Sequence, residues 1–118
     1  MICRPSGHHQ LSRVTQTLAR LGYRRETPTA VMALDCAALN DQVVPEMTAF
    51  TIWPPLAIQG DIWAAGNISA ARQAVMPLVT LPKTSILGRH QDRAAGAAFV
   101  AVDGPVAMVH AIEIAPAA

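Results

Sequence analysis

Charged side chains are scarce in this sequence of 118 residues. Nine lysines and arginines and eight aspartates and glutamates make up 14% of the chain, against about 25% in ordinary soluble domains. A monomer of this mass exposes roughly 6,000 Å², which so few charges cover thinly. Many of the apolar residues are alanines, which tolerate water. Even so, burying part of this weakly charged surface against a second copy is the simplest way to reduce its exposure to water. We therefore expect a homo-oligomer, most simply a dimer.

The charges that are present nearly cancel, because the formal net charge is +1. Proteins that bind nucleic acid or anionic lipid through electrostatics usually concentrate positive charge on one region. The excess of arginine over lysine would suit specific bidentate contacts, but codon bias in a GC-rich genome explains it better. We therefore predict no nucleic-acid partner.

Cysteines and long hydrophobic runs are also few. The opening residues, MICRPSGHHQLSRV, contain no apolar run typical of a signal peptide. The most apolar stretch, AAFVAVDGPVAMVHAIEIA, is interrupted by polar residues, a glycine and a proline, which argues against a membrane span. Cys3 and Cys36 are then expected to be reduced thiols. These features favour a cytoplasmic protein without a membrane partner.

Helical spacing of apolar residues is clearest in HHQLSRVTQTLARLGY, where Leu11, Val14, Leu18 and Leu21 lie on one face. Gly22 fits the left-handed conformation at the end of this helix. We also predict a short strand over 2–4, an extended segment over 23–27, a strand over 29–35, and a turn or short helical piece over 36–42.

Strand-forming residues return in MTAFTIW, residues 47–53, and Pro54-Pro55 ends this strand because neither proline can donate to a ladder. The stretch ISAARQAVM predicts a second helix, capped by Asn67 and ended by Pro77. Residues 80–96 are predicted to be an irregular polar segment. A hairpin follows, with strands over 98–102 and 106–114 and a turn over 103–105.

This order of elements, β-α-β-β-α-β-β, predicts one α+β domain over residues 1–118. Its sheet would be mostly antiparallel with both helices on one face, as in a ferredoxin-like sandwich. In the last strand, alternation places Val106, Met108, His110, Ile112 and Ile114 on one face and Ala107, Val109, Ala111 and Glu113 on the other. Both sets are largely apolar, so we expect both faces to be covered, one of them by another subunit.

Both tryptophans, Trp53 and Trp63, lie in the stretch IWPPLAIQGDIWAAGNIS, whose connection is mostly apolar although surface loops are usually polar. The 53–66 loop is therefore expected to pack on its own core, which is the favoured interpretation, on a ligand, or on a partner. Gly60 and Gly66 precede a helix start, but five residues separate them and no lysine follows. This spacing does not match a phosphate-binding P-loop, and a plain helix-entry loop is favoured.

The histidines do not show the spacing of a metal site. His8 and His9 are adjacent and would point about 100° apart on a helix. His110 and Glu113 should face opposite sides of a strand. Because no Cys-x-x-Cys motif occurs either, we predict neither a metal nor a cofactor. His110, on an apolar strand face, is either a hydrogen-bonded core residue, the favoured interpretation, or a proton carrier that lines a cavity.

Polar side chains cluster in GRHQDR, residues 88–93, where Arg89, His90 and Arg93 could hold a carboxylate or phosphate. The same spacing suits the solvated face of a short helix, which we favour. Cys36 has no base beside it and is predicted to be an inert buried thiol. No serine lies in a Gly-x-Ser-x-Gly elbow.

Two functions fit these observations. The first is a small cytoplasmic, self-associating α+β protein that acts as a binding or accessory module for a small molecule or a protein partner, with contacts at the 53–66 loop. The alternative is a small cofactor-free enzyme in which His110, or His8 and His9, transfers protons in an apolar pocket, and Arg89 or Arg93 holds an acidic substrate. A cavity that His110 lines within reach of an arginine would favour the enzyme.

Overall fold

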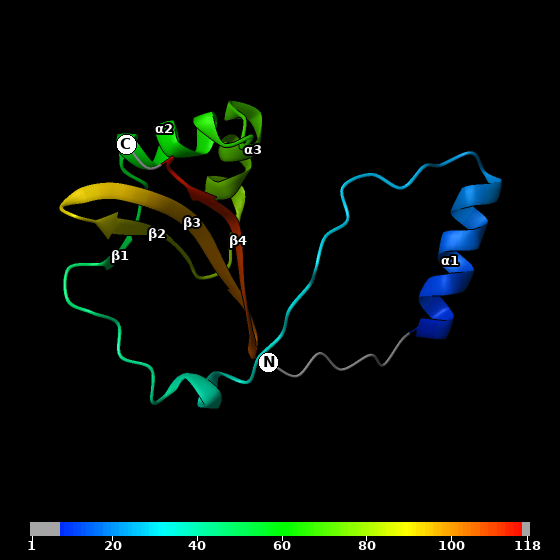
Figure 1. Ribbon diagram of the computed structural model, residues 1–118, viewed down its shortest axis with the longest axis horizontal. Coiled ribbons are helices and arrows are strands. Elements are labelled where there is room, and N and C mark those ends of the chain that lie inside the picture. Colours follow the sequence, from blue (N-terminus) through cyan, green and yellow to red (C-terminus); the bar gives the residue numbers. More distant parts are fainter. Residues whose placement is uncertain (1–7, 117–118) are drawn as a thin grey trace. The chain divides into compact units, whose positions relative to one another are not determined.

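The computed structural model describes residues 8–116, and their side chains from residue 12 onward. The chain divides into two compact units, Met1–Gln42 and Val43–Ala118 (Figure 1). The single domain over residues 1–118 stays a prediction. The strand predicted over 2–4 lies outside the described residues.

The first unit contains the helix α1 (His8–Arg20), which confirms the helix predicted from apolar spacing. Its end is a Schellman motif, because the Gly22 N–H donates to the Ala19 carbonyl and the Tyr23 N–H to the Leu18 carbonyl. Gly22 has a φ of +86°, the left-handed conformation predicted for it.

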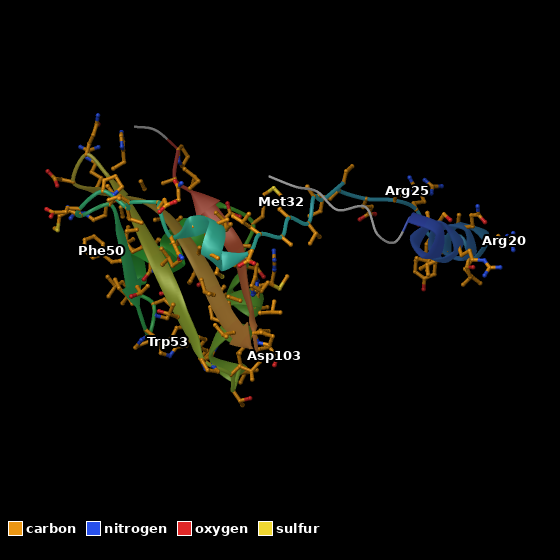
Figure 2. The ribbon with its side chains drawn as sticks, turned by 90° about the horizontal axis from the view of Figure 1, so that it is seen from below. Arg20, Arg25, Met32, Phe50, Trp53 and Asp103 are labelled. Carbon is orange, nitrogen blue, oxygen red and sulfur yellow. The ribbon has the colours of Figure 1, made fainter. Side chains whose placement is uncertain are left out.

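The segment that follows α1 contains little regular structure. The 3₁₀ helix η1 (Cys36–Leu39) confirms the short helical piece, and the Asp35 carboxylate caps it by accepting a hydrogen bond from the Ala37 N–H at 2.9 Å. The strand predicted over 29–35 is wrong. These residues, among them Met32 in Figure 2, pair with no strand that the structure describes, and their side chains are exposed. Apolar, β-branched residues do not form a strand without a neighbour that accepts their hydrogen bonds.

The second unit is built on an antiparallel sheet. Its strands β1 (Ala49–Ile52), β2 (Lys83–His90), β3 (Arg93–Asp103) and β4 (Val106–Ile114) pair in sequence order. The α+β class and the antiparallel sheet agree with the sequence analysis. Because every strand lies beside the next one in sequence, the described sheet lacks the interlocked βαβ halves of a ferredoxin-like sandwich.

The three strands predicted over 47–53, 98–102 and 106–114 are confirmed, and the irregular segment predicted over 80–96 is wrong. β1 lies within the strand predicted over 47–53, and β3 and β4 form the predicted hairpin, whose turn contains Gly104 at a φ of +55°. Residues 80–96, predicted to be irregular, contain all of β2 and the start of β3. Ser85 shows how a polar residue that suggested a loop is accommodated in the sheet. Ser85 is fully buried, and its hydroxyl donates to the Ile52 carbonyl and accepts from Gln59 Nε2.

The chain between β1 and β2 forms the helices α2 (Ala57–Ala65) and α3 (Ala70–Val75) and the 3₁₀ turn η2 (Met76–Leu78). α2 corrects the expectation of a 53–66 loop. Its sequence, AIQGDIWAA, is apolar on nearly every side, so it lacks the periodicity that reveals a surface helix. α3 was predicted, but Ser69 caps it instead of Asn67: the Ser69 hydroxyl accepts from the Arg72 N–H. Across the described residues, every helix is too short or too polar to cross a lipid bilayer.

The sheet has two different faces. We call the covered face the one on which α2 packs against β3 and β4 (Figure 1). The register places Ile52, Ser85, Phe99 and His110 in one row across this face. The core lies here and consists of Ile62, Trp63, Ile68, Met76, Ala97 and Phe99. The alternate residues form the open face, which no helix of the Val43–Ala118 unit covers.

Candidate functional site: a pocket on the covered face

A pocket of about 260 Å³ lies between the sheet and the helical layer of the second unit. The sheet supplies Phe99 and Ala101 from β3 and His110 and Ala111 from β4. The helical layer supplies the other lining residues, which are Ile68, Arg72, Val75, Met76 and Val79. The pocket is partly open to solvent and mostly apolar.

Aromatic packing fixes the floor of this pocket. Phe99 and His110 face each other across β3 and β4, with ring centroids 5.2 Å apart and planes at 86°, an edge-to-face contact. Trp53, at the end of β1 (Figure 2), packs on the other side of Phe99 at 5.9 Å. Phe99 is 1% exposed, so this row of rings is held from below by the sheet and from both sides by its neighbours.

A lysine anchors the wall that η2 and the residue after it contribute. The Lys83 ammonium donates to the carbonyls of Pro77, at 3.0 Å, and of Val79, and it lies 5.0 Å above the Trp53 ring. These contacts tie the end of η2 to β2 and to the end of β1. They therefore position Val79 beside the pocket.

A β-bulge in β4 decides which side chains reach the covered face. Ala97 pairs with Glu113 and Phe99 with His110, so two residues of β4 stand opposite Ala98 alone. Ala111 has a φ of +51° here, and its carbonyl accepts a 2.7 Å hydrogen bond from the Trp63 indole N–H. The bulge interrupts the alternation, which places His110 and Glu113 on the same face.

This result corrects the prediction that His110 and Glu113 face opposite sides. His110 lines the pocket, and the Glu113 side chain lies against Gly66 at the C-terminal end of α2. A Cβ at Gly66 would overlap the Glu113 carboxylate, so the glycine makes room for this side chain. The predicted faces of β4 change accordingly. Ile112 and Ile114 lie with Val109 on the open face.

Two polar residues, Arg72 and His110, line the pocket, and both are exposed to solvent at its edge. Arg72 donates from Nη1 to the Asn67 carbonyl at 3.3 Å, and its other guanidinium N–H groups have no protein partner among the described residues. The nitrogens of the His110 ring likewise have no hydrogen-bond partner within residues 8–116. These groups can donate hydrogen bonds to a bound molecule. No acidic side chain lines the pocket, so its only full charge is positive.

Trp53 and Trp63, the two tryptophans predicted as binding residues, occupy different environments. Trp63 is 1% exposed and belongs to the core, in agreement with the favoured interpretation of the apolar segment. Trp53 is 37% exposed at the end of β1. The two indoles do not share a surface patch, since one of them has almost no surface.

Arg89, His90 and Arg93 lie at the β2–β3 hairpin and not on the short helix that the sequence suggested. Arg89 forms an ion pair with Asp92 at 3.2 Å and lies 5.9 Å from the centre of the Phe50 ring. The turn residue Gln91 and Asp92 both have positive φ, which closes the hairpin and prevents a helix. None of the three predicted residues lines the pocket.

The remaining candidates lie in the first unit. His8 and His9 begin α1, and their side chains are outside the described part of the structure, as is all of Cys3. Cys36 is exposed, which corrects the prediction of a buried thiol. Its apolar neighbours do not form the strand that would have buried it. Among the described residues, no group of three or more histidines, cysteines or acids could hold a metal ion.

Arg72 was not predicted as a site residue, although its spacing from apolar neighbours in the sequence gave a signal. Arg72 follows Ile68 by four positions and precedes Val75 by three, so the helix predicted from ISAARQAVM places it beside these apolar residues, although α3 itself begins at Ala70. An arginine among apolar residues at this spacing indicates a charge at the edge of an apolar site.

Comparisons with protein-family models, curated proteins and solved structures find no match to this chain.

Proposed function

We propose that the Val43–Ala118 unit is a binding module for a small, mainly apolar molecule held in the pocket on the covered face. The observation that carries this proposal is the composition of the lining. Seven of its nine residues are apolar, and the other two, Arg72 and His110, present unused hydrogen-bond donors. An apolar cavity with a few convergent polar groups is typical of ligand sites in proteins.

The size of the pocket limits the ligand. A volume of about 260 Å³ is just below the usual range for drug-sized ligands, which begins at about 300 Å³. At about 30 Å³ per water-sized group, this space accommodates a molecule of roughly eight to ten non-hydrogen atoms. A nucleotide or a large cofactor would not fit within this space and would have to extend out of its open side.

We further propose that the protein self-associates through the open face. Val109, Ile112 and Ile114 on this face are 49%, 61% and 73% exposed. By the register and the bulges, the open face comprises Ala49, Thr51, Thr84, Ile86, Gly88, His90, Arg93, Gly96, Ala98, Val100, Val102, Ala107, Val109, Ile112 and Ile114.

Arg93, at the end of the open face beside the β2–β3 turn, is its only fully charged residue, and only 14% of the chain is charged. A mainly apolar face of this kind is complementary to its own copy in a two-fold dimer.

The free, exposed thiol of Cys36 supports a reducing, cytoplasmic location.

One observation favours the alternative of a cofactor-free enzyme. His110 lines a pocket whose wall also includes an arginine, although this is Arg72 and not Arg89 or Arg93. In that function His110 would carry a proton and Arg72 would hold an acidic substrate. We retain binding as the primary proposal because no second proton-transfer group lines the pocket.

The proposed binding function is tested with a pocket-filling variant. Fragments of eight to ten non-hydrogen atoms are screened by ¹⁵N NMR, and the best one is titrated into the wild-type protein, Ala101→Leu and Ala64→Leu. Ala101 lines the pocket, whereas Ala64 is exposed on α2. We expect Ala101→Leu to weaken binding at least about tenfold, because the added atoms occupy ligand volume, and Ala64→Leu to leave it unchanged. Equal affinity in both variants, or no fragment that binds, would refute the proposal.

A further inference from the structure

We propose that the ligand of this pocket is a small monocarboxylic acid, with its hydrocarbon part in the apolar pocket and its carboxylate held by Arg72 and His110. This inference rests on the proposed binding function and specifies the chemical class of the ligand. It follows from the charge of the lining, the unused donors and the size of the space.

The charge of the lining selects an anion. Arg72 is the only fully charged residue that lines the pocket, and no carboxylate within the described residues forms an ion pair with it. Glu113 lies on the same face of β4, but its side chain is directed against Gly66 at the end of α2 and does not line the pocket. Arg72 is exposed at the edge of this apolar pocket and has no counter-ion among the described residues, so its guanidinium is available to pair with a bound acid.

The geometry of the donors suits one carboxylate. The Arg72 guanidinium has five N–H donors, and the Asn67 carbonyl accepts from a single terminal nitrogen, Nη1. A planar carboxylate can therefore accept two parallel bonds from the rest of the fork. His110 offers a further donor from the sheet side, where the edge-to-face contact with Phe99 fixes its ring.

A phosphate fits this lining less well than a carboxylate does. Phosphate sites usually combine several cations with backbone N–H groups at a glycine-rich loop or at the start of a long helix. Here α3 has six residues, Gly66 accommodates Glu113, and the only lysine of the chain donates to carbonyls of η2 and of the residue that follows it. One arginine and one histidine match a singly charged acid.

Matched acids and amides test the inference. Phenylacetate and phenylacetamide, and 4-methylpentanoate and 4-methylpentanamide, have the same shape within each pair and differ in charge. Dissociation constants come from ¹⁵N NMR titrations at pH 7 with wild-type protein, Arg72→Gln, His110→Gln and Arg93→Gln. We expect wild-type protein to bind each acid about tenfold or more tightly than its amide, since hydrogen bonds between charged groups are the stronger ones.

The variants assign the preference to the pocket. We expect Arg72→Gln to reduce the ratio of amide to acid dissociation constants to near one and His110→Gln to reduce it partly. Arg93→Gln removes the same charge from the hairpin and should leave the ratio unchanged. Unchanged amide binding in each variant shows that the pocket is intact.

The outcomes separate this inference from the proposed function. Equal binding of acids and amides, or an acid preference that survives Arg72→Gln or falls equally in Arg93→Gln, overturns the inference and leaves the binding function standing. If neither acids nor amides bind while other fragments of similar size do, the inference alone fails. If no small molecule binds to the pocket, both fail.

Discussion

The two faces of the sheet use the same strands, and they differ in what packs against them. On the covered face, every polar group in the interior has a partner: the Leu56 N–H donates to Gln59 Oε1 at 2.9 Å, and Gln59 Nε2 donates to the Ser85 hydroxyl at 3.0 Å. The open face contains mainly small and β-branched residues, with His90 and Arg93 at its end beside the β2–β3 turn, and Ile114 is 73% exposed. The side chains on an apolar strand face are therefore buried only where another layer packs against that face.

This difference separates the two proposed roles. A covered face with a polar network and an incompletely filled space can bind a ligand with a defined orientation. A face made mainly of small and β-branched side chains is better suited to a broad contact with a copy of itself. We therefore assign ligand binding to the covered face and self-association to the open face.

The largest expected effect concerns stability. Phe99→Ala should reduce the free energy of unfolding by about 3–5 kcal/mol, because it removes a buried ring from the centre of the covered face. Val100→Ala, the next residue on β3 and on the open face, should cost less than about 1.5 kcal/mol in the monomer. Urea unfolding followed by circular dichroism at low protein concentration measures both values. Similar losses would contradict the distinction between the faces.

The second expected effect concerns self-association. Val109→Lys should weaken the homo-oligomer at least about hundredfold, because it buries an unpaired charge in the contact between open faces. Leu78→Lys is the matched control, since Leu78 is 73% exposed on η2, away from the open face. Sedimentation at micromolar concentration measures the association. A wild-type species of 12.5 kDa would show that the isolated chain is monomeric and remove this proposal.

The smallest expected effect concerns the bulge in β4. Gly66→Ala should destabilise the unit by less than about 1 kcal/mol, because its Cβ would displace the Glu113 carboxylate, the flexible end of a partly exposed side chain. Adding Glu113→Ala should remove most of this loss, since the overlap disappears. Thermal unfolding of the single variants and the double variant gives the coupling. Additive losses would show that Glu113 is not beside Gly66.

Elements with a clear pattern could be predicted from the sequence. α1 has apolar residues at helical spacing and a glycine at its end, and the β3–β4 hairpin has a glycine and a proline at its turn. α2 and β2 could not be predicted in the same way. The apolar residues of α2 surround the helix, and the buried polar group of Ser85 in β2 becomes acceptable only through its contact with Gln59, 26 residues earlier.

The candidate site was predictable in part. His110 was selected because it interrupts an apolar strand, and it lines the pocket, but the favoured interpretation of it as a hydrogen-bonded core residue is wrong because the residue is exposed. The bulge that places Glu113 on the same face depends on Ala111 at a positive φ and on the hydrogen bond from Trp63, a contact 48 residues apart in sequence. No local pattern indicates such a bulge. The choice of Arg72 over Arg89 and Arg93 likewise depends on how α3 packs against α2 and η2, which brings Arg72 to the pocket.

The most direct test of the account is a filtered NOE experiment on the protein bound to phenylacetate. We expect NOE contacts between the ring protons of the ligand and the methyl groups of Ile68, Val75 and Ala111 on the covered face. We expect none to the methyl groups of Val109 or Ile114. Contacts with the open-face methyl groups instead, or bound ligand without contacts to the pocket, would contradict the assignment of ligand binding to the covered face.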